Sequence, residues 1–339
     1  MPQCKALTNQ IHYNIDGNFL PCCAFDTELV FPVSEYTPIE FLTSPFMHDI
    51  RNEMQTGWHN GCIICKRNED ANKFSLRQHY NLWCRQNDVI EFLDLSLNNT
   101  CNLTCRMCDE ISSSKWAEIK QTVGHRHNFA DIINHLPDIK YIKYVGGEPF
   151  ITPEVKDIID YAAEKHITLT VNTNGTFFPY KHLNKLKLTK SLNVGVSIDG
   201  YQYTNDYIRN GSNFEQISKV MAEWINFYKE HKGILSIDTT VQAYNLHDLS
   251  NIKLYANTIG VQWLPQLLEK PMHYNINALP ENYIDEILDE TNTQFVKNYK
   301  FDELAWNALC SQTKLNDTLF NKNIADYNPI LHKYINGEA

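Results

Sequence analysis

Residues 91–108 read EFLDLSLNNTCNLTCRMC and place three cysteines directly after a short apolar run. The run 91–97 has the length and composition of a buried strand, and polar residues follow it. Cys101, Cys105 and Cys108 are separated by three and by two residues. Three thiols this close together on a loop that leaves a strand can each bind one iron of a cubane cluster.

Further short apolar runs follow along the chain and alternate with helical segments. The segment 153–166 starts with Pro and has acidic residues in its first turns, as a helix does. The segment 213–231 has apolar residues near helical spacing, namely Phe214, Ile217, Val220, Met221, Ile225 and Phe227. The later strands are predicted at 141–145, 166–172, 192–198, 235–241 and 261–268. Six strands that alternate with helices predict an α/β fold with a parallel sheet, either a partial barrel or a doubly wound sheet.

The two ends of the chain have a different pattern. Residues 10–23 predict two short strands around the Asp16-Gly17 turn, and a helix is expected over 38–56. Polar helical stretches are expected at 281–292, 301–313 and 322–336. We therefore predict an N-terminal α+β module (1–88), a central α/β domain (89–270) and a C-terminal helical extension (271–339).

Composition limits the functional classes. The chain has 339 residues, with 30 Lys and Arg against 40 Asp and Glu, so its formal net charge is −10. This charge weighs against nucleic-acid binding. No apolar run reaches the roughly 18 residues of a membrane helix, and no export signal is recognised, so we expect a cytoplasmic protein without membrane contact. In a reducing compartment the ten cysteines are not expected to form disulfides.

Iron is not the only metal that the triplet could bind. A structural zinc site normally closes with four ligands, whereas a [4Fe–4S] cluster on three cysteines leaves one iron open to another ligand. The alternative without a metal is that these three cysteines are ordinary loop thiols.

The triplet resembles the C-x3-C-x2-C signature of the radical S-adenosylmethionine (SAM) superfamily, and later strand ends reinforce the resemblance. A Gly-Gly-Glu-Pro turn follows the second central strand, Asn-Thr-Asn-Gly the third and Ser-Ile-Asp-Gly the fourth. By this resemblance the central domain is a partial (β/α)6 barrel. The residues expected to contact SAM are Gly146, Gly147, Glu148, Pro149, Thr173, Asn174, Ser197, Asp199 and Arg209, together with Met107, which stands where the family usually has an aromatic residue.

The resemblance also implies a mechanism. SAM would chelate the open iron, and an electron from the reduced cluster, supplied by a partner such as flavodoxin or ferredoxin, would cleave SAM to methionine and a 5′-deoxyadenosyl radical. That radical abstracts hydrogen from a substrate.

The N-terminal cysteines resemble a second family element. Cys4-x12-Gly17-x4-Cys22, followed by Cys62-x2-Cys65, is similar to the SPASM and twitch domains that carry auxiliary clusters, although those usually follow the barrel. The resemblance implies one auxiliary [4Fe–4S] cluster, with structural zinc as the alternative. Cys23 competes with Cys22 as a ligand. For Cys84 and Cys310 a buried inert thiol is expected.

The resemblance favours radical modification, by oxidation or cross-linking, of a peptide or protein side chain. Modification of a nucleoside, nucleotide or sugar is the alternative within enzymes. An iron–sulfur electron carrier or sensor without SAM chemistry is the alternative outside them.

Overall fold

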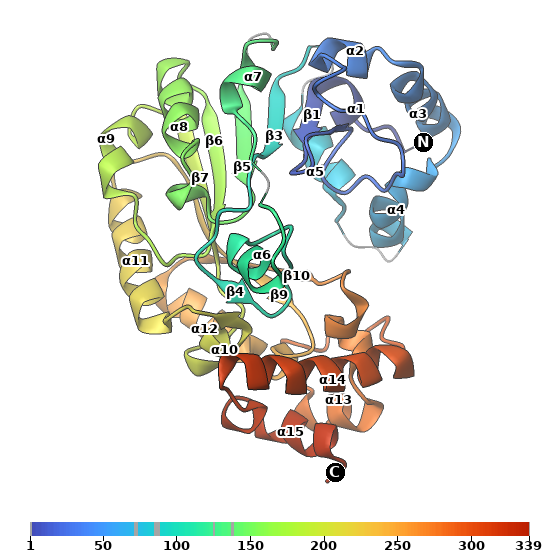
Figure 1. The fold of residues 1–339 in the computed structure, drawn as a ribbon, viewed down its shortest axis with the longest axis vertical. Coiled ribbons are helices and arrows are strands. Elements are labelled where there is room, and N and C mark those ends of the chain that lie inside the picture. The colour runs from blue at the N-terminus through green and yellow to red at the C-terminus, as the bar shows by residue number, and fades with distance from the viewer. Residues whose placement is uncertain (1, 71–73, 85–88, 125, 137–138, 339) are drawn as a thin grey trace. The chain divides into compact units, whose positions relative to one another are not determined.

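The computed structural model describes residues 2–70, 74–84, 89–124, 126–136 and 139–338 (Figure 1). It confirms each of the six predicted central strands to within two residues at either end. These strands are β3 (Phe92–Ser96), β5 (Tyr141–Val145), β6 (Thr168–Thr173), β7 (Ser191–Ser197), β9 (Gly233–Val241) and β10 (Gln262–Leu267).

The strand order distinguishes the two architectures that the sequence left open. The sheet runs β10–β9–β7–β6–β5–β3–β1–β2, so the six central strands are neighbours in the order in which they occur along the chain. β3 pairs with β5, β5 with β6 and β9 with β10, all in parallel. A doubly wound sheet reverses its order at a switch point, whereas a barrel keeps it. The fold is therefore a partial barrel.

The predicted N-terminal hairpin is present and extends this sheet. β1 (Gln10–Tyr13) and β2 (Phe19–Leu20) are antiparallel, with Tyr13 opposite Phe19. β1 also pairs in parallel with β3, so that Ile11 lies opposite Leu93. This second pairing joins segments about eighty residues apart, and the local pattern gave no sign of it.

The prediction of one helix over 38–56 was wrong, because the segment forms α2 (Pro38–Leu42) and α3 (Pro45–Thr56). Pro45 has no N–H for a continuing helix, while the Ser44 hydroxyl accepts the N–H of Met47 and caps the second one. The other helices of this module are α1 (Ala6–Asn9), α4 (Ile63–Asp70) and α5 (Leu76–Trp83).

The chain divides into two compact units, and β6 and β7 contribute residues to both. The first unit comprises residues 1–101, 121–171 and 179–193. On β5, Ile142 and Tyr144 are buried and alternate with half-buried residues, so one sheet face is covered and the other is more open. Ile158 and Ile159 of α8 are fully buried as well. The helices between the strands of this unit are α7 (Phe129–Ile133), α8 (Val155–Glu164) and α9 (Leu183–Leu186).

The second unit comprises residues 102–120, 172–178 and 194–339. Its long helix α11 (Phe214–Phe227) begins where the Asn213 side chain accepts the N–H of Gln216. Trp224, rather than the predicted Ile225, is the fully buried residue of its third turn. The remaining elements are β4 (Thr104–Cys105), α6 (Ser114–Lys120), α10 (Tyr203–Ile208), β8 (Arg209–Asn210), α12 (Leu249–Ile259), α13 (Glu281–Ile287), α14 (Glu303–Phe320) and α15 (Pro329–Asn336).

The C-terminal residues are helical as predicted, but the boundaries differ. α14 extends seven residues beyond the expected end at 313, and α15 begins at Pro329 rather than near residue 322. α13 contacts α15, and α14 lies against the short turns Met272–Tyr274 and Ile276–Ala278 (Figure 1). Within the described ranges, no helix is long and apolar enough to cross a membrane.

Candidate active site

The cysteine loop has regular backbone structure at its second cysteine. β4 pairs antiparallel with β8, so that Cys105 lies opposite Arg209. The indole N–H of Trp116 donates to the Cys105 carbonyl at 2.9 Å, and the Cys108 N–H donates to the same carbonyl at 3.1 Å. Contact with Cys108, followed by burial, raises the pKa of the Cys105 thiol well above its ordinary value. The two thiols therefore lie close together, and the Cys105 thiol holds its proton until a metal replaces it.

Two predicted SAM contacts, Asp199 and Arg209, pair with each other. Arg209 Nη2 lies 2.8 Å from Asp199 Oδ2, and both side chains are buried. Asp199 Oδ1 accepts the Thr240 N–H at 2.7 Å. Burial raises the pKa of Asp199, opposed by the Arg209 charge. Arg209 Nε has no hydrogen-bond partner among the described residues, so the guanidinium retains a donor for a further anionic group.

The remaining predicted contacts of the second unit occupy strand ends. Thr173 is the last residue of β6 and is buried, and Ser197 ends β7 half-buried. Asn174 Nδ2 donates to Asn102 Oδ1 at 2.9 Å, which holds the β6 end against the cysteine loop. Met107 is half-buried within that loop.

Within the first unit, the backbone of the turn at 146–149 comes close to the residue that precedes Cys101. The Glu148 N–H donates to the Thr100 carbonyl at 2.7 Å. Gly146 and Gly147 have φ of +103° and +48°, and a Cβ on Gly147 would lie 2.2 Å from the Thr100 oxygen. Glu148 is fully buried and caps the short helix that Pro149 begins, accepting the Phe150 N–H at 3.2 Å. This turn therefore requires glycine and stands against the residue that precedes Cys101.

Arg106, between two predicted iron ligands, connects the cysteine loop to α14. Its buried guanidinium lies 2.6 Å from Asp317 Oδ1 and donates from Nε to the Tyr207 carbonyl at 2.9 Å. It also lies 3.6 Å from the centre of the Tyr207 ring, and the Tyr207 hydroxyl donates to Asp317 at 2.9 Å. The C-terminal extension is thus bonded to the loop that carries Cys105 and Cys108.

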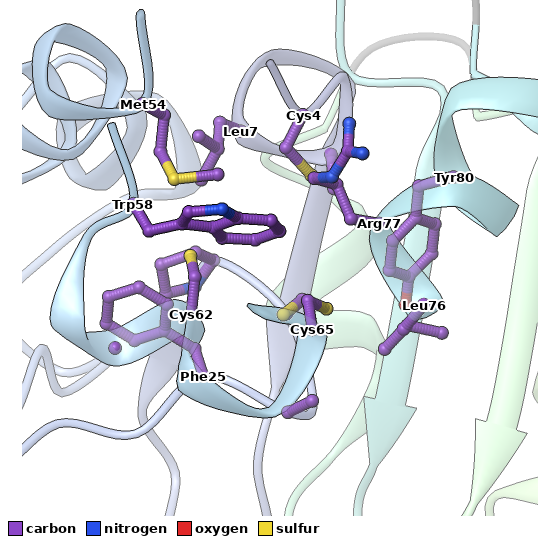
Figure 2. Close-up of a pocket in the computed structure, with 15 residues that line it drawn as sticks. Cys4, Leu7, Phe25, Met54, Trp58, Cys62, Cys65, Leu76, Arg77 and Tyr80 are labelled. Atoms are coloured by element: carbon purple, nitrogen blue, oxygen red, sulfur yellow. The ribbon is translucent and has the colours of Figure 1, made fainter. Parts of the chain in front are cut away.

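The four N-terminal cysteines predicted as one ligand set line a single cavity. Cys4, Cys22, Cys62 and Cys65 surround a space of about 390 Å³, counted out to its opening on solvent. Figure 2 shows three of them around this space, with Trp58 and Arg77 also lining it. Among the described residues, no three His, Cys, Asp or Glu side chains converge on a single metal ion. Thiols that share a cavity suit a cubane, in which each thiolate binds a different iron.

Backbone N–H groups face the sulfurs of this cavity. Burial raises the pKa of Cys4 to about 12, partly offset by the N–H of Ala6. Cys65 faces the N–H groups of Leu76 and Arg77, the first residues of α5, and these lower its pKa against the larger effect of burial. Hydrogen bonds to the sulfurs of a cluster are one of the determinants of its reduction potential. The cavity therefore provides hydrogen-bond donors as well as cysteine ligands.

Arg77 was not assigned to this site by the sequence. Burial raises the pKa of Cys4, Cys62 and Cys65, and the Arg77 charge offsets part of this rise. Its guanidinium forms a two-point contact with Glu69, with Nε–Oε1 at 2.8 Å and Nη2–Oε2 at 2.7 Å. Nothing in the local sequence identified it, because a charged residue near the start of a helix is usually solvated.

In the structure, Cys22 and Cys23 lie in different surroundings. Cys22 lines the cavity, whereas Cys23 is exposed and contacts the Lys143 ammonium, with Nζ–Sγ at 3.9 Å. Cys84 is buried and lies against Ala6, Tyr80 and Phe92. Cys310 is half-buried on α14.

The central residues of the chain resemble a known protein family. Residues 95–242 match the model of the Radical SAM superfamily. This range includes Cys101, Cys105 and Cys108 and every predicted SAM contact. This part of the chain is similar to radical SAM domains.

The relatives of this domain are diverse. The chain is 30% identical over 134 residues to the mycofactocin maturase MftC of Mycobacterium tuberculosis (38% of this chain, 33% of that protein). It is 27% identical over 175 residues to the AdoMet-dependent heme synthase of Nitratidesulfovibrio vulgaris (49% and 45%). The chain therefore spans a third to a half of the length of these relatives. Among solved structures, Streptococcus suis SuiB bound to precursor peptide SuiA superposes with a TM-score of 0.39 and 13% identity (95% of this chain, 73% of that one).

The close approach at Gly147 predicts a stability effect in the first unit. Gly147→Ala places a methyl group against a backbone oxygen at positive φ, so the free energy of unfolding should fall by about 2 kcal/mol or more. Urea denaturation measures it. Gly57→Ala is the matched control, since no atom lies within 4 Å of its added Cβ. An equal loss in the two variants would contradict this account of the turn.

The ion pair between Arg106 and Asp317 predicts a second effect on the free energy of unfolding. Asp317→Ala leaves a buried guanidinium without its counter-charge and should lower the free energy of unfolding by about 3 kcal/mol. Asp326→Ala, at an exposed neighbouring position, should change it by no more than about 0.5 kcal/mol. If urea denaturation finds both variants as stable as the parent, α14 does not hold the cysteine loop.

Proposed function

We propose that this protein is a radical SAM enzyme. The observation that supports it most is the uninterrupted cysteine triplet inside the matched domain, on a loop whose neighbouring turn needs Gly147. Cys101, Cys105 and Cys108 would hold a [4Fe–4S] cluster whose fourth iron binds SAM. When bound, the reduced cluster supplies the electron that cleaves SAM to methionine and a 5′-deoxyadenosyl radical, which abstracts hydrogen from the substrate.

The residues of the chain would orient SAM. The turn at 146–149 presents backbone without side chains at two positions, which suits close approach of the SAM amino group. Arg209 keeps an unpartnered Nε within the described part of the chain and would meet the SAM carboxylate. Thr173, Asn174, Ser197 and Asp199 would contact the ribose or carboxylate, and Met107 would cover the adenine face.

An auxiliary [4Fe–4S] cluster on Cys4, Cys22, Cys62 and Cys65 is the second part of the proposal. The shared cavity supports it, since all four predicted thiols line one space and backbone N–H groups face three of their sulfurs. Arg77 would offset the negative charge of the thiolates. The cluster module would comprise residues 1–88, the barrel 89–270 and the helical extension 271–339.

A peptide or protein is the substrate class that we favour. MftC is named a maturase, and the Bacillus subtilis relative SkfB, 27% identical over 124 residues, is named a sporulation killing factor maturation protein (34% of this chain, 28% of that one). A tetrapyrrole is the second candidate, because another relative, matched over 175 residues, is named a heme synthase. Flavodoxin or ferredoxin would supply electrons.

The two substrate classes can be compared directly. A true substrate should increase 5′-deoxyadenosine formation over the basal rate, because productive binding brings the hydrogen donor to the radical. Stimulation by iron-coproporphyrin, with none from candidate precursor peptides, would replace the peptide assignment by the tetrapyrrole one.

The radical SAM assignment predicts product formation from SAM. After anaerobic reconstitution with iron and sulfide, the protein should form 5′-deoxyadenosine from SAM and dithionite, measured by liquid chromatography. A variant with Cys101, Cys105 and Cys108 all changed to Ala should form none. Equal product from the two proteins would contradict the assignment and favour a non-catalytic iron–sulfur carrier.

If the auxiliary cluster is present, the protein should bind iron even when the cysteine triplet is removed. The same triple variant should retain about four irons per chain. Adding Cys22→Ser should remove most of this iron, whereas adding Cys23→Ser should not, because only Cys22 lines the cavity. Zinc in place of iron would refute the auxiliary cluster, and equal iron in the two serine variants would refute Cys22 as its ligand.

A further inference from the structure

Arg77 contributes the one cationic side chain among the described residues that line the cysteine cavity (Figure 2). Apart from the four cysteines, the other lining residues are apolar, aromatic or glycine, as Leu7, Met54 and Trp58 exemplify. A cluster held by four thiolates is negatively charged, and one-electron reduction makes it more so. An apolar wall disfavours that added charge, whereas a nearby cation favours it. Arg77 is therefore placed to oppose the effect of the wall.

The Arg77 guanidinium is held from two sides. Nε and Nη2 donate to Glu69 at 2.8 Å and 2.7 Å, and Nη1 donates to the carbonyl of Gln3, which precedes Cys4, at 2.7 Å. The Ser75 hydroxyl donates to Glu69 Oε1 at 2.5 Å and fixes the carboxylate in turn. The Arg77 side chain is 13% exposed and that of Glu69 is 18% exposed. The positive charge thus has a defined position, which a solvated arginine would lack.

The charges of Arg77 and Glu69 act on the sulfurs in opposite directions. Burial raises the pKa of Cys65, the Glu69 charge adds to this rise, and the Arg77 charge offsets part of it. Burial likewise raises the pKa of Cys4 and Cys62, again with a partial offset from Arg77. A charge that favours the thiolate also favours negative charge on a cluster that the same sulfurs bind. Arg77 should therefore favour the reduced cluster, and Glu69 should disfavour it.

We propose that Arg77 raises the reduction potential of the auxiliary cluster, and that Glu69 both positions Arg77 and limits this rise. The inference rests on the auxiliary cluster of the proposed function. Net charge around a cluster is one of the determinants of its potential, and a mostly buried charge is screened little by salt. A raised potential suits a cluster that accepts an electron better than one that donates it to a more negative acceptor.

The potential of the auxiliary cluster can be measured without SAM cleavage. The host is the full chain with Cys101, Cys105 and Cys108 changed to Ala, reconstituted anaerobically with iron and sulfide, so that the auxiliary cluster is the one that remains. Electron paramagnetic resonance follows the reduced cluster while dithionite and mediator dyes set the solution potential.

Three variants of this host test the charges. Arg77→Gln should make reduction about tenfold less favourable, a fall of about 59 mV for one electron. Glu69→Gln should make reduction about threefold more favourable, because its amide oxygen still accepts from the guanidinium but no longer cancels its charge. Arg67→Gln is the matched control, since Arg67 is exposed on α4 and does not line the cavity, and it should change the equilibrium less than about twofold.

Opposite shifts distinguish an effect of charge from a loss of structure, which would move both cavity variants in the same direction. An unchanged or raised potential in Arg77→Gln, or an equal fall in Arg67→Gln, would overturn the proposal. If Arg77→Gln binds no iron, Glu69→Gln carries the test, and a fall or no shift in that variant would overturn it.

The failure of this inference differs from the failure of the proposed function. A host that binds iron but whose potential does not respond to Arg77 and Glu69 overturns this inference alone. A host without iron would contradict the auxiliary cluster, and this inference with it. Formation of 5′-deoxyadenosine by the unchanged chain would still support the radical SAM assignment in either case.

Discussion

The contact between the Thr100 carbonyl and the turn at 146–149 is the constraint on which the proposed chemistry depends. Thr100 precedes the first cysteine of the triplet, and its oxygen accepts the Glu148 N–H where a Cβ on Gly147 would clash. One hydrogen bond and one missing side chain thus hold the start of the cluster loop against the turn expected to meet SAM. Both segments follow adjacent parallel strands, β3 and β5, whose carboxyl ends share an edge of the sheet.

The other end of the loop is held differently. Cys105 is fixed by the short β4–β8 pairing and by Trp116, and Arg106 extends to Asp317 on α14. A loop with three potential ligands has little apolar surface of its own, so hydrogen bonds and a buried ion pair define its shape. This gives the C-terminal extension a structural role that its sequence did not reveal. The Arg106–Asp317 pair joins residues 211 positions apart, and no local pattern records such a pairing.

Local signals in the sequence predicted much of the fold. Apolar runs gave the six central strands, and Asp16-Gly17 gave the hairpin. The resemblance to SPASM and twitch domains gave a cysteine set that lines one cavity. The break in the 38–56 helix was signalled by Ser44-Pro45 and was missed because apolar periodicity continues across it. The addition of β1 to the sheet and the place of Arg77 at the cavity depend on long-range packing, which periodicity does not encode.

The central claim is that one chain holds two clusters of different kinds, one open to SAM and one closed by four thiolates. Electron paramagnetic resonance of the dithionite-reduced protein, recorded with and without SAM, tests it most directly. The account predicts signals from two clusters, of which SAM shifts the one that the cysteine triplet holds and leaves the other unchanged. A single signal, or two signals that both ignore SAM, would contradict it.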